Sequence, residues 1–334
     1  MDKQETYSRV LGALSGVAIG DAFGMPCEMW SQRRIRRTYG YIDKLYPGNP
    51  ENEISAGLQA GEVTDDTVFT LIVSHLLIEH KGGIDPELFV EKIRQWAGSD
   101  SKSKNVLGPS TKRALQEIDA GRPIEYAGRM GESNGASMRI LPVGIAQDYR
   151  NLPELVENVR RICLPTHNTN QAISGASAVA AAVSYAVRCG NSFEEMLDVA
   201  VEAAALGSEQ GFDLCGPSIG KRIRIAQKIA LNARDEETFF QDVYDIVGTG
   251  LPTVQTVPAV FAAVLFAKGD PTACAKLAAN LGGDTDTIGA ISCGITGAYS
   301  GIERFDHAIL DQVIQVNHLD LESVAKQLTE LYCL

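Results

Sequence analysis

The chain has 334 residues, of which 45% are hydrophobic and 7% aromatic, and its formal net charge at pH 7 is −12. This acidic balance argues against a protein that binds the phosphate backbone of nucleic acids, because such binding depends on Lys and Arg. The one basic run is interpreted as a solvated helix face, with a role near an anionic substrate as the alternative; it comprises Arg33, Arg34, Arg36 and Arg37.

Seven cysteines, at positions 27, 163, 189, 215, 274, 293 and 333, include no Cys-x-x-Cys pair. That pattern favours neither a disulfide framework nor a zinc site, and it predicts reduced, buried thiols in a cytoplasmic protein. The first residues lack the features of a secretion signal, and we expect no segment that approaches the length of a membrane span. No linker, charge block or repeat divides the sequence, so we expect one large domain over residues 1–334.

Apolar periodicity predicts helices along most of the chain. The first, at about 7–23, contains small residues that would let neighbouring backbones approach closely, and the segment from 28 to 60 is expected to be a long irregular loop. Another loop is expected at 98–109. No run shows the alternation that a sheet requires, so the chain is predicted to be all-α. Further helices are expected at 64–81, 85–96, 111–120, 153–163, 170–188, 193–206, 218–232, 236–247, 254–267, 272–280, 285–299, 306–316 and 321–331.

Two acidic clusters stand where a loop runs into an apolar helix: Thr64-Asp65-Asp66-Thr67 and, more than 200 residues later, Asp284-Thr285-Asp286-Thr287. Brought face to face, they would offer four carboxylates and several hydroxyls, which are the ligands that hard divalent cations prefer. No Lys or Arg lies beside either cluster, so bound metal would supply the missing positive charge. The alternative is that both are helix N-caps, where Thr and Asp are favoured, but one cap needs a single acceptor oxygen.

Three further features are candidates for the same site. Glu28 follows a helix break at Gly24 and Pro26 and could reach into a cleft. The polar segment 133–139 precedes an apolar run, and its backbone N–H groups could hold an anion or a sugar hydroxyl. His167 is expected in a polar loop at a helix start, where a functional and a structural role are equally open.

Together these segments resemble the ADP-ribosylglycohydrolase family, which includes the hydrolase that removes ADP-ribose from dinitrogenase reductase. The matching motifs occur in the family's order across residues 12 to 301: Gly12-Ala13-Leu14, Gly20-Asp21-Ala22-Phe23-Gly24 through Glu28, Thr64-Asp65-Asp66-Thr67, Ser133-Asn134-Gly135-Ala136-Ser137-Met138-Arg139, Thr166-His167-Asn168 and Leu281 to Gly289. The resemblance implies a single large orthogonal helical domain with two magnesium or manganese ions in a central cleft.

The resemblance also implies roles for individual residues. Metal ligands would be Thr64, Asp65, Asp66, Asp284, Asp286 and Thr287, and the substrate pocket would be lined by Asn134, Gly135, Ser137, Met138 and His167. Glu28, Asp66 and Asp286 are the candidate catalytic residues. The implied reaction is hydrolysis of an ADP-ribosyl N- or O-glycosidic bond, with the substrate either ADP-ribosylated or a small molecule.

Two alternatives stay open. The same metals could serve a nucleoside hydrolase that needs no diphosphate cradle, or the chain could be an inactive ADP-ribose-binding protein. Differences from the family pattern lie where specificity would be decided: Ser300 to Phe305 lacks an expected Ile-Pro and Trp, and Gly207 to Ser218 holds one aromatic residue. No sequence feature indicates a nucleic-acid or membrane partner.

Overall fold

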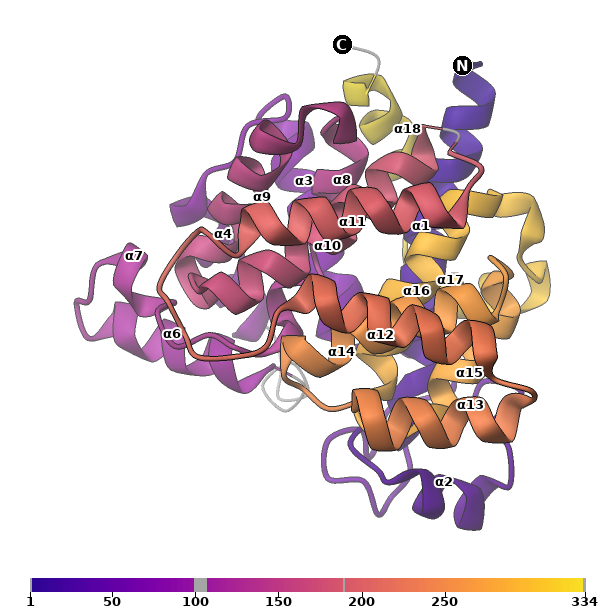
Figure 1. Cartoon of the computed structure of the whole chain (residues 1–334). Helices are drawn as coiled ribbons and strands as arrows, with labels where there is room; N and C mark the ends of the chain where they lie inside the picture. Colours follow the sequence, from indigo (N-terminus) through magenta and orange to yellow (C-terminus); the bar gives the residue numbers. More distant parts are fainter. Residues whose placement is uncertain (1, 99–106, 189, 333–334) are drawn as a thin grey trace.

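Helices form nearly all the regular structure in this computed structural model, which describes residues 2–98, 107–188 and 190–332 (Figure 1). Within those ranges β pairing is limited to three isolated bridges, with no strand. The prediction of an all-α fold is therefore confirmed.

The longer helices in the first half of the chain are α1 (Lys3–Gly24), α2 (Gln32–Tyr39), α3 (Asp65–Glu79), α4 (Pro86–Ala97), α6 (Pro109–Asp119), α9 (Leu152–His167) and α10 (Asn170–Val187). Those in the second half are α11 (Phe193–Gly207), α12 (Ile219–Asn232), α13 (Glu236–Asp242), α14 (Thr253–Phe266), α15 (Pro271–Leu281), α16 (Thr285–Ser300), α17 (His307–Asn317) and α18 (Leu321–Tyr332). Short helices are η1 (Met25–Cys27), α7 (Ile124–Ala127), η2 (Asn134–Ala136), α8 (Leu141–Ala146), η3 (Tyr149–Asn151), the π-helix η4 (Val243–Val247) and η5 (Ile302–Arg304).

The first helix and α16 lie side by side in the middle of the fold, although they come from opposite ends of the chain (Figure 1). Glycines spaced four residues apart on α1 face the backbone of α16, as expected when the rows of side chains at i and i+4 pack together. A Cβ added to Gly16 or Gly20 would lie 2.1 Å from the carbonyl oxygen of Cys293 or Gly289. The small residues therefore set the close approach that the sequence predicts, and this contact fixes the ends of both helices.

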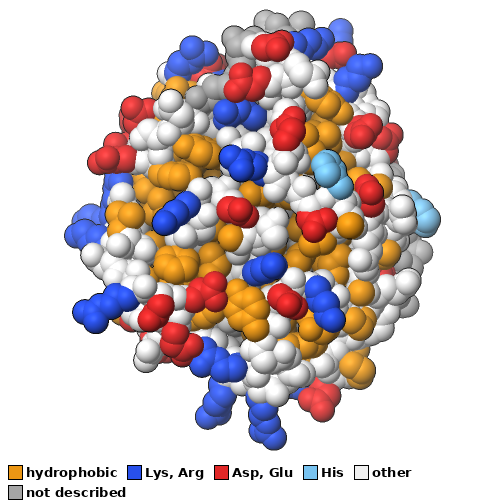
Figure 2. All heavy atoms as spheres, turned by 90° about the vertical axis from the view of Figure 1, so that its right-hand side faces the viewer, with side chains coloured by type: hydrophobic (Ala, Val, Ile, Leu, Met, Phe, Trp, Pro, Cys, Tyr) orange, Lys and Arg blue, Asp and Glu red, His pale blue; other side chains and the backbone are white. Residues whose placement is uncertain are grey.

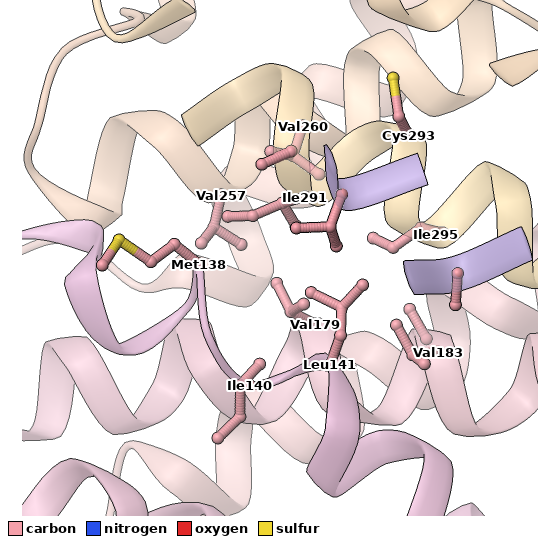
Figure 3. Close-up of a cluster of buried hydrophobic side chains, with 14 of the residues drawn as sticks. Met138, Ile140, Leu141, Val179, Val183, Val257, Val260, Ile291, Cys293 and Ile295 are labelled. Atoms are coloured by element: carbon pink, nitrogen blue, oxygen red, sulfur yellow. The ribbon is translucent and has the colours of Figure 1, made fainter. Parts of the chain in front are cut away.

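A continuous apolar core surrounds these two helices. Figure 3 shows part of it, where Leu141 of α8, Val179 of α10, Val257 of α14 and Ile291 of α16 lie together with 0% exposure. Met138 lies at the edge of the same cluster and is 4% exposed. The polar groups of the site described below are thus carried on helices whose other faces are tightly packed.

One stretch, Lys3–Cys27, is long and apolar enough to cross a membrane by length and composition, so the expectation that no segment reaches that length was wrong. The most apolar part of this stretch is completely buried inside the protein. The core helix of a globular protein has the same length, composition and burial.

Several expected boundaries differ from the structure. The segment 28–60 is not irregular throughout, because α2 lies within it, capped by the Ser31 side chain, which accepts from the Arg34 N–H. Helix α9 continues through Pro165 to His167, so His167 ends a helix and is completely buried, where a polar loop was expected. The expected loop at 98–109 lies largely outside the described residues.

The surface expectations are mostly confirmed. The arginines of α2 are exposed, and two of them form surface ion pairs, Arg34 with Glu51 and Arg36 with Glu237. Figure 2 shows basic and acidic side chains mixed over one face of the protein.

The free cysteines 27, 163, 274 and 293 are buried as expected, but Cys215 is exposed. Cys189 and Cys333 lie outside the described residues.

Candidate active site

Six carboxylates from three parts of the chain gather where α1, α3 and α16 meet. Asp21 comes from the last turn of α1, Asp65 and Asp66 from the first turn of α3, and Asp284 and Asp286 from the start of α16; Glu28 follows η1. The two acidic clusters of the sequence touch directly, because Thr287 Oγ1 donates a hydrogen bond of 3.3 Å to Asp66 Oδ2. The expected convergence of the two clusters is thus observed, while the role of these residues as metal ligands stays a prediction.

Asp21 fastens the start of α3 to the end of α1. Its carboxylate accepts the backbone N–H of Thr64 at 3.0 Å and of Thr67 at 3.1 Å. It also accepts the hydroxyls of Thr64 at 3.0 Å and Thr67 at 2.5 Å. A carboxylate at a helix N-terminus interacts favourably with the helix dipole, and these bonds satisfy N–H groups that the helix itself leaves free.

The N-cap alternative holds for one cluster and fails for the other. Thr64 is the N-cap of α3, and its hydroxyl accepts the N–H of Asp66. Asp284 occupies the N-cap position of α16 but accepts no capping hydrogen bond from that helix. Its Oδ2 instead accepts from the side-chain amide of Asn134, which also donates to Thr256 Oγ1 at 2.9 Å. The carboxylate of Asp284 is therefore directed into the site.

Glu28 lies at the edge of the cluster and is only partly covered. One of its oxygens lies within 4.8 Å of oxygens of Asp284 and Asp286. The chain around it is held in place, because Asn52 donates to the Glu28 carbonyl at 3.0 Å and the next N–H, of Met29, donates to Gly283 at 2.7 Å. Glu28 is thus the carboxylate of the cluster nearest to solvent.

Burial and mutual repulsion raise the pKa values of the clustered carboxyls. Burial raises the pKa of Asp65 to about 7, with the negative charge of Asp21 adding to the effect. For Asp66, Asp286 and Glu28 burial again dominates, and the neighbouring carboxylates push each pKa further up. Within the described ranges none of the six forms an ion pair with Lys or Arg. Protons or cations must therefore offset this charge.

The donor set fits hard divalent cations. Two triads each have ligand oxygens within 4.8 Å of one another, Asp21 with Asp66 and Asp286, and Glu28 with Asp284 and Asp286. Asp66 Oδ1 and Asp286 Oδ1 are buried and accept no hydrogen bond. Buried carboxylate oxygens without a partner are costly, and a cation with an all-oxygen shell would satisfy them. Asp286 belongs to both triads.

All five of the expected substrate residues are buried. Asn134 reaches the cluster through Asp284, whereas Ser137 Oγ is buried and accepts or donates no hydrogen bond. Met138 lies in the apolar core, and its carbonyl accepts from Thr70 at 3.1 Å. Gly135 leaves room for the ring of His167, since a Cβ there would lie 2.8 Å from its Cε1.

His167 is held between two hydroxyls. Its Nε2 lies 3.0 Å from Ser133 Oγ and its Nδ1 2.7 Å from Thr166 Oγ1, which in turn accepts from the buried Arg139 at 2.7 Å. Burial, with the positive charge of Arg139, lowers the pKa of His167 well below its ordinary value. The imidazole thus contacts Ser133 and Thr166 from within the core. A direct contact of His167 with substrate stays a prediction.

Sequence reasoning assigned no role to Asp21 and left Thr67 out of the ligand set. A signal for Asp21 was available, because it is the only charged residue between Val10 and Gly24 of the apolar α1. A carboxylate on such a face needs partners, and here they are the hydroxyls and N–H groups of α3.

The fold is helical, and its site is a cluster of carboxylates. Such all-oxygen donor sets are suited to hard divalent cations. The chain is a member of the ADP-ribosylglycohydrolase family, whose model matches residues 2–334, and this family consists of hydrolases that act on glycosidic bonds. The recognition of the family from its motifs is confirmed.

Three similar proteins illustrate the range of the family. The chain is 38% identical over 323 residues to the uncharacterized protein YegU of Escherichia coli, covering 96% of each chain. It is 24% identical to ADP-ribosylhydrolase ARH3 of Xenopus tropicalis, covering 98% of this chain and 96% of that one. A solved structure titled ADP-ribosylglycohydrolase-related protein complex matches with a TM-score of 0.69 at 25% identity, over 98% of this chain and 99% of that one.

Proposed function

We propose that the protein is a metal-dependent hydrolase that cleaves an ADP-ribosyl N- or O-glycosidic bond. The observation that carries this proposal is the cluster of six carboxylates, five of them buried, with two unpartnered oxygens on Asp66 and Asp286, in a family of glycosidic-bond hydrolases. Two Mg²⁺ or Mn²⁺ ions would be held by Thr64, Asp65, Asp66, Asp284, Asp286 and Thr287. Ions bound there would supply Lewis-acid polarisation of substrate oxygens.

The chain's own groups suit the rest of the reaction. The bond between the anomeric carbon and the acceptor atom breaks, its electron pair leaves with the acceptor, and water oxygen bonds to the carbon. Glu28, at the exposed edge of the cluster and with a raised pKa, can accept the proton of the attacking water and pass one to the acceptor. Clustered carboxylates stabilise the positive charge that develops on the ribose ring in an oxocarbenium-like state.

The nucleoside hydrolase alternative uses the same carboxylates without a diphosphate cradle. Calorimetry with ADP-ribose and with a panel of nucleosides, each with and without Mg²⁺, separates the two. We expect Mg²⁺-dependent binding of ADP-ribose and turnover of an ADP-ribosylated substrate. Binding of nucleosides alone would favour the alternative. Tight ADP-ribose binding with no turnover on any acceptor linkage would favour an inactive ADP-ribose-binding protein.

A further inference from the structure

A series of side-chain hydrogen bonds connects the buried Arg139 with Ser110 at the start of α6. Arg139 donates to Thr166 Oγ1 at 2.7 Å, and this hydroxyl lies 2.7 Å from His167 Nδ1. On the other side of the imidazole, Nε2 lies 3.0 Å from Ser133 Oγ, which donates to Ser110 Oγ at 3.0 Å. None of the five side chains is more than 7% exposed, so the series is shielded from solvent.

Arg139 gives this series its direction. A guanidinium can only donate hydrogen bonds, and Arg139 stays protonated at neutral pH although burial lowers its pKa to about 10. Thr166 Oγ1 must therefore accept from Arg139, which leaves the single hydrogen of this hydroxyl for another partner. Among the described residues, the other side-chain atom bonded to the hydroxyl is His167 Nδ1. Thr166 thus donates to Nδ1, and Nδ1 carries no proton.

The proton of the imidazole is then placed by elimination. Burial and the positive charge of Arg139 lower the pKa of His167 well below its ordinary value, which favours a ring with one proton. Because the hydrogen bond at one ring nitrogen decides which nitrogen is protonated, this proton lies on Nε2. Nε2 donates to Ser133 Oγ, and Ser133 gives its own hydrogen to Ser110. Every hydrogen bond of the series therefore points away from Arg139.

The series joins two segments that both touch the carboxylate cluster. Ser133 directly precedes Asn134, whose side-chain amide donates to the Asp284 carboxylate. At the other end, α6 begins just after Gly108, whose backbone N–H donates to Asp65 Oδ2 at 3.4 Å. A change in the direction of the series would consequently act on groups that hold two of the clustered carboxylates.

The charge of Arg139 is costly where it lies. Its Nε and Nη1 atoms are buried and have no hydrogen-bond partner in the part of the chain that the structure describes. The guanidinium carbon lies 4.8 Å from the centroid of the Phe89 ring. The neighbouring thiol of Cys163 supplies no negative charge, because burial raises its pKa to about 12. An apolar side chain would fill the same position without the cost of a buried cation, which favours a role for the charge itself.

We propose that Arg139 is a positioning residue that acts through Thr166 to fix His167 in the tautomer protonated at Nε2. This tautomer keeps the hydrogen bond from Ser133 to Ser110 and thereby holds Asn134 against Asp284. The effect on a metal site at Asp284 rests on the proposed function, whereas the assignment of the tautomer does not.

The tautomer is measured by ¹⁵N NMR on the full-length protein labelled at its five histidines, since long-range ¹H–¹⁵N correlations distinguish protonated from unprotonated ring nitrogens. His167→Gln identifies the signals of His167 by their loss. The parent should show a protonated Nε2 and an unprotonated Nδ1. Thr166→Val and Arg139→Met should each lose this single tautomer and give a mixture or protonation at Nδ1. Arg139→Lys, which can still donate to Thr166, should keep the parental pattern.

The matched control is Thr329→Val, because Thr329 is also 1% exposed and its hydroxyl donates to the Ala325 carbonyl, outside the series. Thr329→Val should leave the tautomer of His167 unchanged. Titration with Mg²⁺ provides the second measurement. Thr166→Val should weaken Mg²⁺ binding about threefold, as expected for a change within a network that contacts a ligand, and Thr329→Val should not.

A parent protein protonated at Nδ1, or a Thr166→Val variant that keeps the parental tautomer, would overturn the assignment; Thr166→Val decides it even if Arg139→Met does not fold. A changed tautomer with parental Mg²⁺ affinity would overturn the positioning role. If the parent binds no Mg²⁺, the proposed metal-dependent function fails together with that role, while the NMR comparison still decides whether Arg139 fixes His167.

Discussion

Gly20 of α1 and Gly289 of α16 face each other so closely that a Cβ on either would lie 2.1 or 2.3 Å from the carbonyl oxygen of the other. Each neighbours a site carboxylate, Asp21 directly and Asp286 three residues away. The spacing of these two carboxylates is therefore set by backbone contact, and a change at the contact should act on the site.

Gly20→Val is expected to destabilise the protein by about 1–3 kcal/mol, because overpacking forces the two helices apart. It should also weaken Mg²⁺ binding, although Gly20 offers no ligand atom. Chemical denaturation and Mg²⁺ titration measure the two effects. The control is Ala298→Gly, a change at a buried position farther along α16, which should lower stability without a matching loss in Mg²⁺ affinity. Unchanged Mg²⁺ affinity in Gly20→Val would show that the contact between α1 and α16 does not control the geometry of the carboxylate cluster.

Asp21→Ala is expected to lower stability by about 3 kcal/mol, because the N–H groups of Thr64 and Thr67 lose a charged acceptor inside the protein. The loss should persist with Mg²⁺ present, since it comes from the anchoring of α3. Denaturation with urea, with EDTA or with Mg²⁺, measures it. A variant as stable as the parent in EDTA would show that Asp21 acts as one more repelling carboxylate.

Asp286→Ala is expected not to lower the stability of the metal-free protein, in contrast to Asp21→Ala. Removal of one repelling carboxylate should preserve or raise the stability of the metal-free protein, while Mg²⁺-dependent stabilisation and turnover are lost. Asp66→Ala should do the same, and Asp311→Ala, an exposed change on α17, serves as control. Near-parental turnover in Asp286→Ala would rule out the two-metal mechanism, and outright unfolding would favour a purely structural role.

Glu28→Ala is expected to lose turnover by about 10²–10⁴-fold, the usual contribution of a positioned acid or base. Because Glu28 lies on the loop after η1 and not on a ligand-bearing helix, most of the Mg²⁺-induced shift in Tm should remain. Turnover and melting are measured on the same preparation. If Mg²⁺ no longer shifts the Tm, Glu28 is mainly a metal ligand, as its closeness to Asp284 and Asp286 would also permit.

The metal-free protein should become less stable as pH rises from about 4 to 7. In that window the folded state holds protons on carboxyls such as Asp65, whose pKa of about 7 exceeds its ordinary value of 3.8, and the unfolded state does not. Stability therefore falls as these protons are lost, by about 1–3 kcal/mol between pH 5 and pH 8. Denaturation in EDTA at both values measures this, and Asp65→Asn should flatten the difference.

The sequence allowed the helical class, the family and the paired clusters to be predicted, because periodicity and short motifs are local properties. It did not reveal the partners that decide what each side chain does. Asp21 was missed because the groups that donate to its carboxylate, on Thr64 and Thr67, lie 43 and 46 residues away. His167 was expected in a loop because it lies in a polar segment ahead of a helix start, yet α9 continues through Pro165 to His167. The single domain over residues 1–334 and the ligand roles remain predictions.

The π-helix Val243–Val247 has a consequence for how such proteins can diversify. Five of the six carboxylates stand on or at the start of α1, α3 and α16, whose packing tolerates little change. Residues Tyr244 to Gly250, which line a cavity of about 610 Å³, instead form a partly exposed connection between α13 and α14. Substitutions in such connections usually leave the fold intact. Related chains could therefore differ in this one turn while keeping the carboxylate cluster unchanged.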